Sequence, residues 1–162
     1  MGTSSKSSTE AEHLVREHWR AVFSLCLAHA LCLSDAEDAL QETFTRAIAG
    51  LDSLREPAKA RAWLFGIARR VCADQGRKRH SVESLPDHVA SKRQPTDERV
   101  EELLAALSRL PEPYREVVSL YYLDGQSTIC LAGNLGLTPA AARQRLARAR
   151  VMLHQLMTRG KT

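Results

Sequence analysis

Basic side chains recur through the C-terminal quarter of the 162-residue chain: Arg143, Arg145, Arg148, Arg150, Arg159 and Lys161. No acidic residue follows Asp124, so this positive charge has no local counter-ion. Guanidinium and ammonium groups gathered in this way bind phosphate oxygens, which a nucleic-acid backbone presents at regular spacing. A basic run alone is also typical of a solvated helix, so the surrounding sequence has to decide between the two interpretations.

The residues before and within this run have the local signals of a helix-turn-helix. Ser127 is suited to cap one short helix, and Gly136 is suited to end it in the left-handed conformation. Thr138 and Pro139 then start a second helix, because proline at the first helical position loses no hydrogen bond. A pair of helices joined by so short a turn is the motif that places its second helix in a DNA major groove.

The second of these helices has two different faces. Its inward face is predicted to carry Ala142, Leu146, Ala149 and Leu153. Its outward face is predicted to carry Arg143, Gln144, Ala147, Arg148 and Arg150. Hydrogen-bond donors beside a small residue suit the edges of base pairs, so this face predicts DNA recognition.

An acidic group lies on an earlier predicted helix. Ser34 and Glu37 have the spacing of a capping box at its start. Leu40, Phe44 and Ile48 predict an inward face, whereas Asp38, Gln41 and Glu42 project outward. Acids at a helix N-terminus are favourable in themselves. That explanation does not extend to Gln41 and Glu42, so we expect a binding surface here.

Residues 55–79 form a second basic segment, ending in Arg77, Lys78 and Arg79 around a predicted helix that contains Trp63 and Arg69. Trp63 is predicted to point inward, with Leu64 and Ile67. An aromatic ring beside basic groups and a loop could hold a single nucleic-acid strand by stacking and phosphate pairing. A solvated basic face over a buried tryptophan fits the segment equally well, and both interpretations stay open at this point.

Cys26, His29 and Cys32 are the residues that could suggest a metal site. A helix brings Cys26 near His29 but turns Cys32 away, and a metal needs three or four ligands. The first two also fall in the apolar face of the first helix, so we expect a packed core with no metal and no cofactor. No nucleophile with a base, phosphate loop or paired carboxylate occurs in the sequence, which predicts a protein without catalytic residues.

The arrangement of the apolar residues predicts an all-α fold of two small helical domains. A long amphipathic helix whose inward, apolar face includes Trp19 follows a polar and mobile start and opens the domain at residues 10–79. Residues 80–96 lack periodicity and contain two prolines, so they are predicted to be a linker. The second domain, residues 97–159, is predicted to be four helices, with Thr96 as the expected cap of the first. Only small contacts between the two domains are expected.

Composition indicates where such a protein works. The four widely spaced cysteines form no CxxC pair, which is typical of a reducing cytosol. No apolar run is long enough to cross a bilayer, and the start has no signal core. We therefore expect a cytoplasmic protein with no direct membrane insertion.

Three segments together resemble one known family. They are DAEDALQETFTRAI at 35–48, RAWLFGIARRVCADQGRKR at 61–79, and LPEPYREVV at 110–118, followed by the helix-turn-helix. Over residues 13–157 the chain resembles the extracytoplasmic-function (ECF) sigma factors of bacterial RNA polymerase. The resemblance implies that the first domain is sigma region 2, which binds core polymerase and the minus-ten element. It implies that the second is sigma region 4, which binds the minus-thirty-five element.

The resemblance also implies roles for individual residues and a further partner. Asp38, Gln41 and Glu42 would contact the polymerase clamp helices. The minus-ten strand would be held by the loop from Leu51 to Arg61, with Trp63, Arg69, Arg77 and Lys78. Base contacts would come from Arg143, Gln144, Ala147 and Arg148, with Thr138, Arg145 and Arg150 at phosphates or packing neighbours. An anti-sigma factor would hold the protein inactive.

Two other classes of function fit parts of the sequence. A stand-alone helix-turn-helix regulator would use the same basic helix without polymerase and would need a dimerisation helix and a palindromic site. The segment from Arg99 to Leu110 is too short for a convincing dimer seam, and the acidic surface would stay unexplained. A metal-dependent enzyme or sensor would need more ligands than Cys26, His29 and Cys32 provide.

Overall fold

The computed structural model describes residues 3–30, 32–83 and 97–159, and within them every regular element is a helix. The N-terminal lobe contains α1 (Thr3–Ala30), α2 (Leu33–Ala49), the 3-10 turns η1 (Leu51–Ser53) and η2 (Pro57–Lys59), and α3 (Ala60–Glu83). The C-terminal lobe contains α4 (Glu98–Ser108), α5 (Glu112–Tyr122), α6 (Thr128–Leu135) and α7 (Pro139–Arg159). The predicted all-α fold of two helical units is confirmed.

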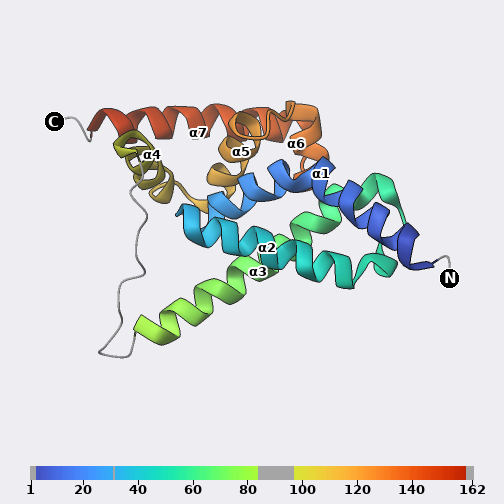
Figure 1. The fold of residues 1–162 in the computed structure, drawn as a ribbon. Coiled ribbons are helices and arrows are strands. Elements are labelled where there is room, and N and C mark those ends of the chain that lie inside the picture. The colour runs from blue at the N-terminus through green and yellow to red at the C-terminus, as the bar shows by residue number, and fades with distance from the viewer. Residues whose placement is uncertain (1–2, 31, 84–96, 160–162) are drawn as a thin grey trace.

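Helix α1 lies at the centre of the molecule. It packs against α2 and α3 on one side and against α5 on the other (Figure 1). Between Ala21 and Ala30 its side chains are buried almost all round, with Val22, Leu25 and Cys26 fully inaccessible. A helix that is apolar on every face is stable only when other elements surround it. The central position of α1 follows from that composition.

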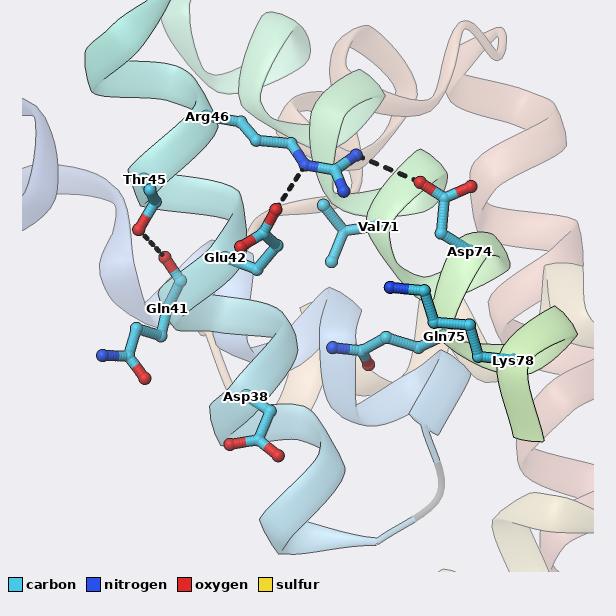
Figure 2. Close-up of a pocket in the computed structure, with 9 residues that line it drawn as sticks. All are labelled: Asp38, Gln41, Glu42, Thr45, Arg46, Val71, Asp74, Gln75 and Lys78. Atoms are coloured by element: carbon cyan, nitrogen blue, oxygen red, sulfur yellow. Dashed lines mark hydrogen bonds and ion pairs between the residues drawn. The ribbon is translucent and has the colours of Figure 1, made fainter. Parts of the chain in front are cut away.

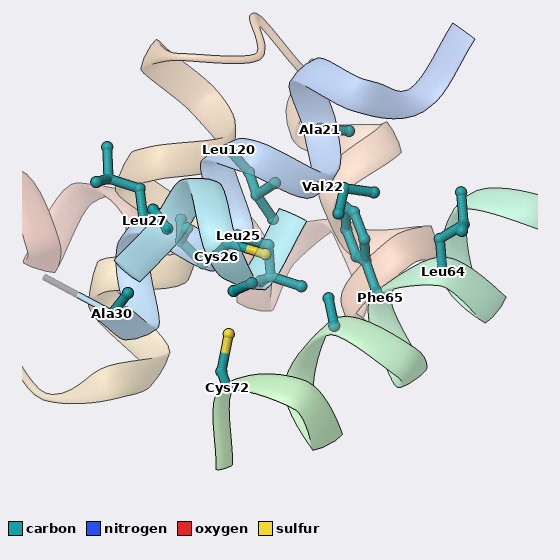
Figure 3. Close-up of a cluster of buried hydrophobic side chains, with 14 of the residues drawn as sticks. Ala21, Val22, Leu25, Cys26, Leu27, Ala30, Leu64, Phe65, Cys72 and Leu120 are labelled. Carbon is teal, nitrogen blue, oxygen red and sulfur yellow. The ribbon is translucent and has the colours of Figure 1, made fainter. Parts of the chain in front are cut away.

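The two lobes share one hydrophobic core. Leu120 of α5 belongs to the same cluster of buried side chains as Val22 and Leu25 of α1 and Phe65 of α3 (Figure 3). Helix α3 also packs against α6. The expectation that the lobes would make only small contacts was wrong, because the second apolar face of α1 had no partner within its own lobe and is covered by α5.

The starts of the first two helices differ from the sequence-based expectations. Helix α1 already begins at Thr3, within the start that was expected to be mobile. Helix α2 begins at Leu33, and its N-cap is Cys32, whose Sγ accepts a hydrogen bond from the Asp35 amide at 3.4 Å. Ser34 is therefore inside the helix and does not open a capping box.

The exposure of two apolar side chains, the end of α3 and the cap of α4 also differ from the sequence-based expectations. Trp19 and Ile48, which were expected to point inward, are 49% and 44% exposed. Helix α3 continues to Glu83, four residues into the range expected for the linker. The remainder of that range, 84–96, including the predicted cap Thr96, lies outside the described residues, and Asp97 caps α4 through its side chain.

Candidate nucleic-acid and protein-binding surfaces

Helices α6 and α7 form the predicted helix-turn-helix, and each predicted local signal is present. Ser127 Oγ accepts a hydrogen bond from the Cys130 amide at 3.2 Å and caps α6. Gly136 ends α6 in the left-handed conformation, with φ of +65°, where a side chain would be strained. Thr138 Oγ1 accepts from the Ala141 amide at 3.1 Å, and α7 begins at Pro139 as expected.

The two faces of α7 are separated as the apolar pattern predicted. Ala142, Leu146 and Ala149 are buried, and Leu153 is partly buried against the core. The exposed face carries Arg143, Gln144, Ala147 and Arg148. Neither arginine forms an ion pair with a described residue, so their guanidinium groups are available to a ligand. Arg145 is half-buried, which favours a packing role over base contact.

Arg150 is held by two aromatic rings. Its guanidinium carbon lies 5.0 Å from the centre of the Tyr121 ring and 5.5 Å from that of Tyr122. The rings are themselves packed edge to face. Cation–π contacts of this kind fix the arginine against α5 and leave it less free than Arg143 or Arg148 to follow a base edge.

A groove of about 470 Å³ lies between α2 and α3 (Figure 2). The predicted polymerase-binding residues Asp38, Gln41 and Glu42 line one wall, from α2, and Lys78 lines the other, from α3. The sequence pattern did not indicate that a residue predicted for DNA binding would share this groove with the acidic group. That juxtaposition depends on how α2 packs against α3.

Arg46 joins the two walls of this groove. Its Nε donates to Glu42 Oε1 at 2.6 Å, and its Nη1 donates to Asp74 Oδ2 at 3.1 Å. The hydrogen bond from Arg46 lowers the pKa of Asp74, against the opposing effect of desolvation. Arg77 also pairs with Asp74, so it is less available to DNA than its sequence position suggested. Asp38 and Gln41 keep their polar groups exposed and without a described side-chain partner.

Trp63 lines a smaller hollow of about 260 Å³ with Gly50, Ser53, Ile67 and Arg70. The ring is half-buried and packs partly against the core, so it is neither a fully buried core residue nor a free one. The hollow borders the loop from Leu51 to Arg61, where the minus-ten strand was expected. An exposed arginine, Arg70, which the sequence interpretation did not select, stands at its edge.

Arg69 and Arg61 face the C-terminal lobe. Arg69 donates from Nε and Nη2 to the two oxygens of Glu116 on α5, at 2.9 and 3.1 Å. Arg61 Nη1 lies 3.5 Å from Asp124 Oδ2, in the turn after α5. Both arginines were predicted to bind the minus-ten strand, and in this structure both are paired with buried carboxylates of the same chain.

His29 completes the polar cluster around Glu116. Its Nε2 lies 2.8 Å from Glu116 Oε1, and its Nδ1 lies 3.7 Å from Glu112 Oε2. Burial alone would raise the pKa of Glu116, but the hydrogen bonds from His29 and Arg69 outweigh it and lower that pKa to about 2. Burial lowers the pKa of His29, and the hydrogen bond and charge of Glu116 more than reverse this, so it is raised overall.

The ligand-type groups around His29 form an ion-pair cluster. One atom each of His29, Glu112 and Glu116 lies within 4.8 Å of the others. Both Glu116 oxygens already accept from the Arg69 guanidinium, whose positive charge opposes a cation there. Cys26 and Cys32 do not join His29 in a ligand group among the described residues. Instead, Cys26 and Cys72 lie in the same buried cluster (Figure 3), and the interaction with the Cys26 thiol lowers the pKa of Cys72.

No helix among the described residues is long and apolar enough to cross a membrane.

Comparisons with known proteins give the same division of the chain. The family model for Sigma-70 region 2 matches residues 14–82, and the model for Sigma-70, region 4 matches residues 100–153. The chain is 32% identical over 149 residues to the ECF RNA polymerase sigma factor SigM of Mycobacterium tuberculosis, covering 90% of this chain and 76% of that protein. It is 32% identical to the ECF RNA polymerase sigma factor SigM of Bacillus subtilis, covering 77% of this chain and 81% of that protein. A probable RNA polymerase sigma factor, RfaY of Xanthomonas campestris, is 37% identical, but this chain spans only 39% of its length.

Two solved structures are similar to both lobes together. The sigma factor RpoE in complex with the anti-sigma factor NepR from Bartonella quintana gives a TM-score of 0.65 at 26% identity, covering 91% of this chain and 96% of that one. CnrH in complex with the cytosolic domain of CnrY gives a TM-score of 0.65 at 28% identity, covering 93% and 89%. Region 2 with its groove, region 4 with its helix-turn-helix, and these relatives agree: the chain belongs to the ECF class of the sigma-70 family of RNA polymerase sigma factors.

Proposed function

We propose that this protein binds core RNA polymerase through its N-terminal lobe and directs it to promoters that its two lobes recognise. The observation that carries the proposal is an exposed face on α7, whose Arg143 and Arg148 form no ion pair with a described residue, in the same chain as the acidic side of the α2–α3 groove. A DNA-binding regulator alone would need only the first of these surfaces. The protein has no catalytic role in this proposal, and the polymerase carries out the chemistry.

The proposed division of labour follows the chemistry of each surface. Asp38, Gln41 and Glu42 would contact the polymerase, because they line the α2 side of the groove and Asp38 and Gln41 are exposed without a described side-chain partner. Arg143, Gln144, Ala147 and Arg148 would read the minus-thirty-five element in the major groove, with Thr138, Arg145 and Arg150 in supporting positions.

The minus-ten strand would lie along the loop 51–61 and α3. Trp63 would offer a face for stacking, and Arg61, Arg69, Arg77 and Lys78 would neutralise phosphates. We further propose that an anti-sigma factor binds this chain, as the anti-sigma factor NepR binds the solved relative RpoE.

Run-off transcription with purified core polymerase on a library of promoters tests this function. We expect transcripts only when the protein is added, from templates that share two sequence elements. Specific binding to a palindromic duplex, with no transcript from any template, would instead support a stand-alone regulator. Co-purification from the native host tests the anti-sigma partner.

A further inference from the structure

Two adjacent tyrosines end α5 where that helix packs against α7 (Figure 1). Tyr121 is partly buried and packs on the hydrophobic core, whereas Tyr122 is 56% exposed. Their ring centres lie 5.0 Å apart and their planes meet at 79°, the edge-to-face geometry that aromatic pairs prefer. The core therefore holds Tyr121, and Tyr121 in turn supports the exposed ring of Tyr122.

Arg150 of α7 is the group that both rings contact. Its guanidinium carbon lies 5.0 Å from the centre of the Tyr121 ring and 5.5 Å from that of Tyr122. Among the described residues, Arg150 forms no ion pair, and neither Arg143 nor Arg148 has a ring contact of this kind. A carboxylate accepts hydrogen bonds from a guanidinium, whereas a π face attracts the cation and leaves its N–H donors free. Arg150 is thus held in place with its donors available.

The position of Arg150 along α7 indicates which part of a duplex it would meet. It follows Arg143 by seven residues, and a heptad of an α-helix falls only about 20° short of two full turns, so both lie on nearly the same face. The rise between them is about 10 Å. The major groove is about 12 Å wide, so a helix that places Arg143 at base edges brings Arg150 to the phosphates that border the groove.

We propose that Tyr121 and Tyr122 are positioning residues for DNA binding, which hold Arg150 ready to bind one phosphate of the minus-thirty-five duplex. This inference rests on the proposed function of α7. A long side chain that has to be ordered on binding reduces affinity by about twofold to tenfold. The two rings order Arg150 when the protein folds, so the binding step avoids that loss. A phosphate contact also adds affinity without sequence preference.

The test uses the full-length protein in complex with core polymerase, so that the polymerase is the same in every measurement. The probe is the duplex that the wild-type complex selects from a pool randomised in the minus-thirty-five region. Tyr121→Leu with Tyr122→Leu, the leucine pair, removes the π faces. Tyr121→Phe with Tyr122→Phe, the phenylalanine pair, keeps the faces and removes the hydroxyls. Tyr114→Leu, which removes a partly buried ring near the start of α5, is the control.

The affinities of these variants should follow the π faces and depend on Arg150. The leucine pair should bind the duplex about threefold more weakly than wild type, whereas the phenylalanine pair and Tyr114→Leu should retain wild-type affinity. The loss in the leucine pair should disappear in an Arg150→Ala background, because the rings act only through that arginine. It should persist in full in an Arg148→Ala background. Circular dichroism checks that the helices of each variant are intact.

Single methylphosphonate substitutions in the duplex locate the contact, because each removes one phosphate charge and leaves the bases unchanged. At one phosphate, the wild-type complex should lose affinity about fivefold and the Arg150→Ala complex should be insensitive. The leucine pair should be less sensitive than wild type at that phosphate and equally sensitive elsewhere. A general disturbance of α7 would not produce a change confined to one phosphate.

Three outcomes would overturn the inference alone. Equal losses from the leucine pair in the wild-type and Arg150→Ala backgrounds would show that the rings only pack α5 against α7. Tighter binding by the leucine pair would show that the rings compete with the phosphate for Arg150. An equal loss in the phenylalanine pair would assign the effect to the hydroxyls. Failure of the wild-type complex to select any duplex would instead overturn the proposed function, and the inference with it.

Discussion

Glu116 of α5 is hydrogen-bonded to both His29 and Arg69 of the N-terminal lobe. Protonation of its carboxylate should therefore change the free energy of unfolding of the protein. Its pKa is lowered from the usual 4.5 to about 2, so its carboxylate contributes stability above pH 4.5 that is lost as the pH falls through about 2. The pKa of His29 is raised from 6.5, so its contribution is complete below pH 6.5 and is lost as the pH rises through the raised value.

These signs predict a pH window. The contribution of the cluster to the free energy of unfolding should be greatest between about pH 4.5 and 6.5, with about 3 kcal/mol from Glu116 lost in acid. Denaturant unfolding of wild type and Glu116→Gln from about pH 2 to about pH 8 measures it, with Glu101→Gln as the control. The Glu116 variant should show a flatter acid limb, and an unchanged acid limb would mean that Glu116 is not the group that titrates.

Arg143 and Arg148 should be the principal base-reading residues of α7. An arginine fork can bond O6 and N7 of one guanine, so replacing either by alanine should cost about 1 to 3 kcal/mol of binding and relax preference at one position. Selection from randomised minus-thirty-five duplexes reads both effects. Arg159→Ala, at the far end of the same helix, is the control. If the alanine variants at 143 and 148 keep the wild-type motif and lose affinity uniformly, the register of α7 proposed here is wrong.

At the scale of single elements, α2 provides the clearest test of polymerase binding. Asp38 lines the groove, whereas Glu37 is exposed on the same helix but outside the groove. Asp38→Lys should weaken binding to core polymerase about tenfold, because a charge is reversed at the contact surface, with little effect on folding. Glu37→Lys carries the same charge change. Equal affinity of both variants in a pull-down titration would remove the groove from the polymerase-binding surface.

The elements that the sequence predicted well are those with local causes. Ser127, Gly136 and Thr138 act on backbone groups within a few residues, so their types and spacing are sufficient to place α6 and α7. The cap of α2 was missed because the sulfur of Cys32 accepts the amide that a serine would normally take. A cysteine is an uncommon cap, and the neighbouring Ser34 was the stronger signal.

The non-local parts of the site could not be predicted in the same way. Trp19 and Ile48 fit the apolar period, but the period does not say how wide the covered face is. Glu116 lies between Arg115 and Val117 in α5, and only the packing of α5 on α1 brings it to His29 and Arg69. The clue available was the apolar character of α1 on all sides from Ala21 to Ala30, which predicts a central helix with partners on both faces.

At the scale of the whole molecule, a shared core predicts that the two lobes unfold together in the free protein. Leu120 of α5 is fully buried in the cluster that contains Leu25 and Phe65 of the other lobe. Leu120→Ala should therefore lower the free energy of unfolding by about 2 to 5 kcal/mol and shift probes of both lobes equally. Hydrogen exchange at α1 and α7 amides measures this shift. Val151→Ala, which truncates an exposed apolar side chain of α7, is the control. A shift confined to α4–α7 would show that the lobes fold independently.

The position of α1 between the lobes also affects how the protein is made. His29 and its partner Glu116 are 87 residues apart in the chain. At a ribosomal rate of about 5 to 20 residues per second, the face of α1 that α5 covers stays exposed for about 4 to 17 seconds before α5 has been synthesised. During that interval the nascent chain exposes an apolar surface that is buried in the finished protein. We therefore expect aggregation or chaperone binding to occur mainly while only the N-terminal lobe has been synthesised.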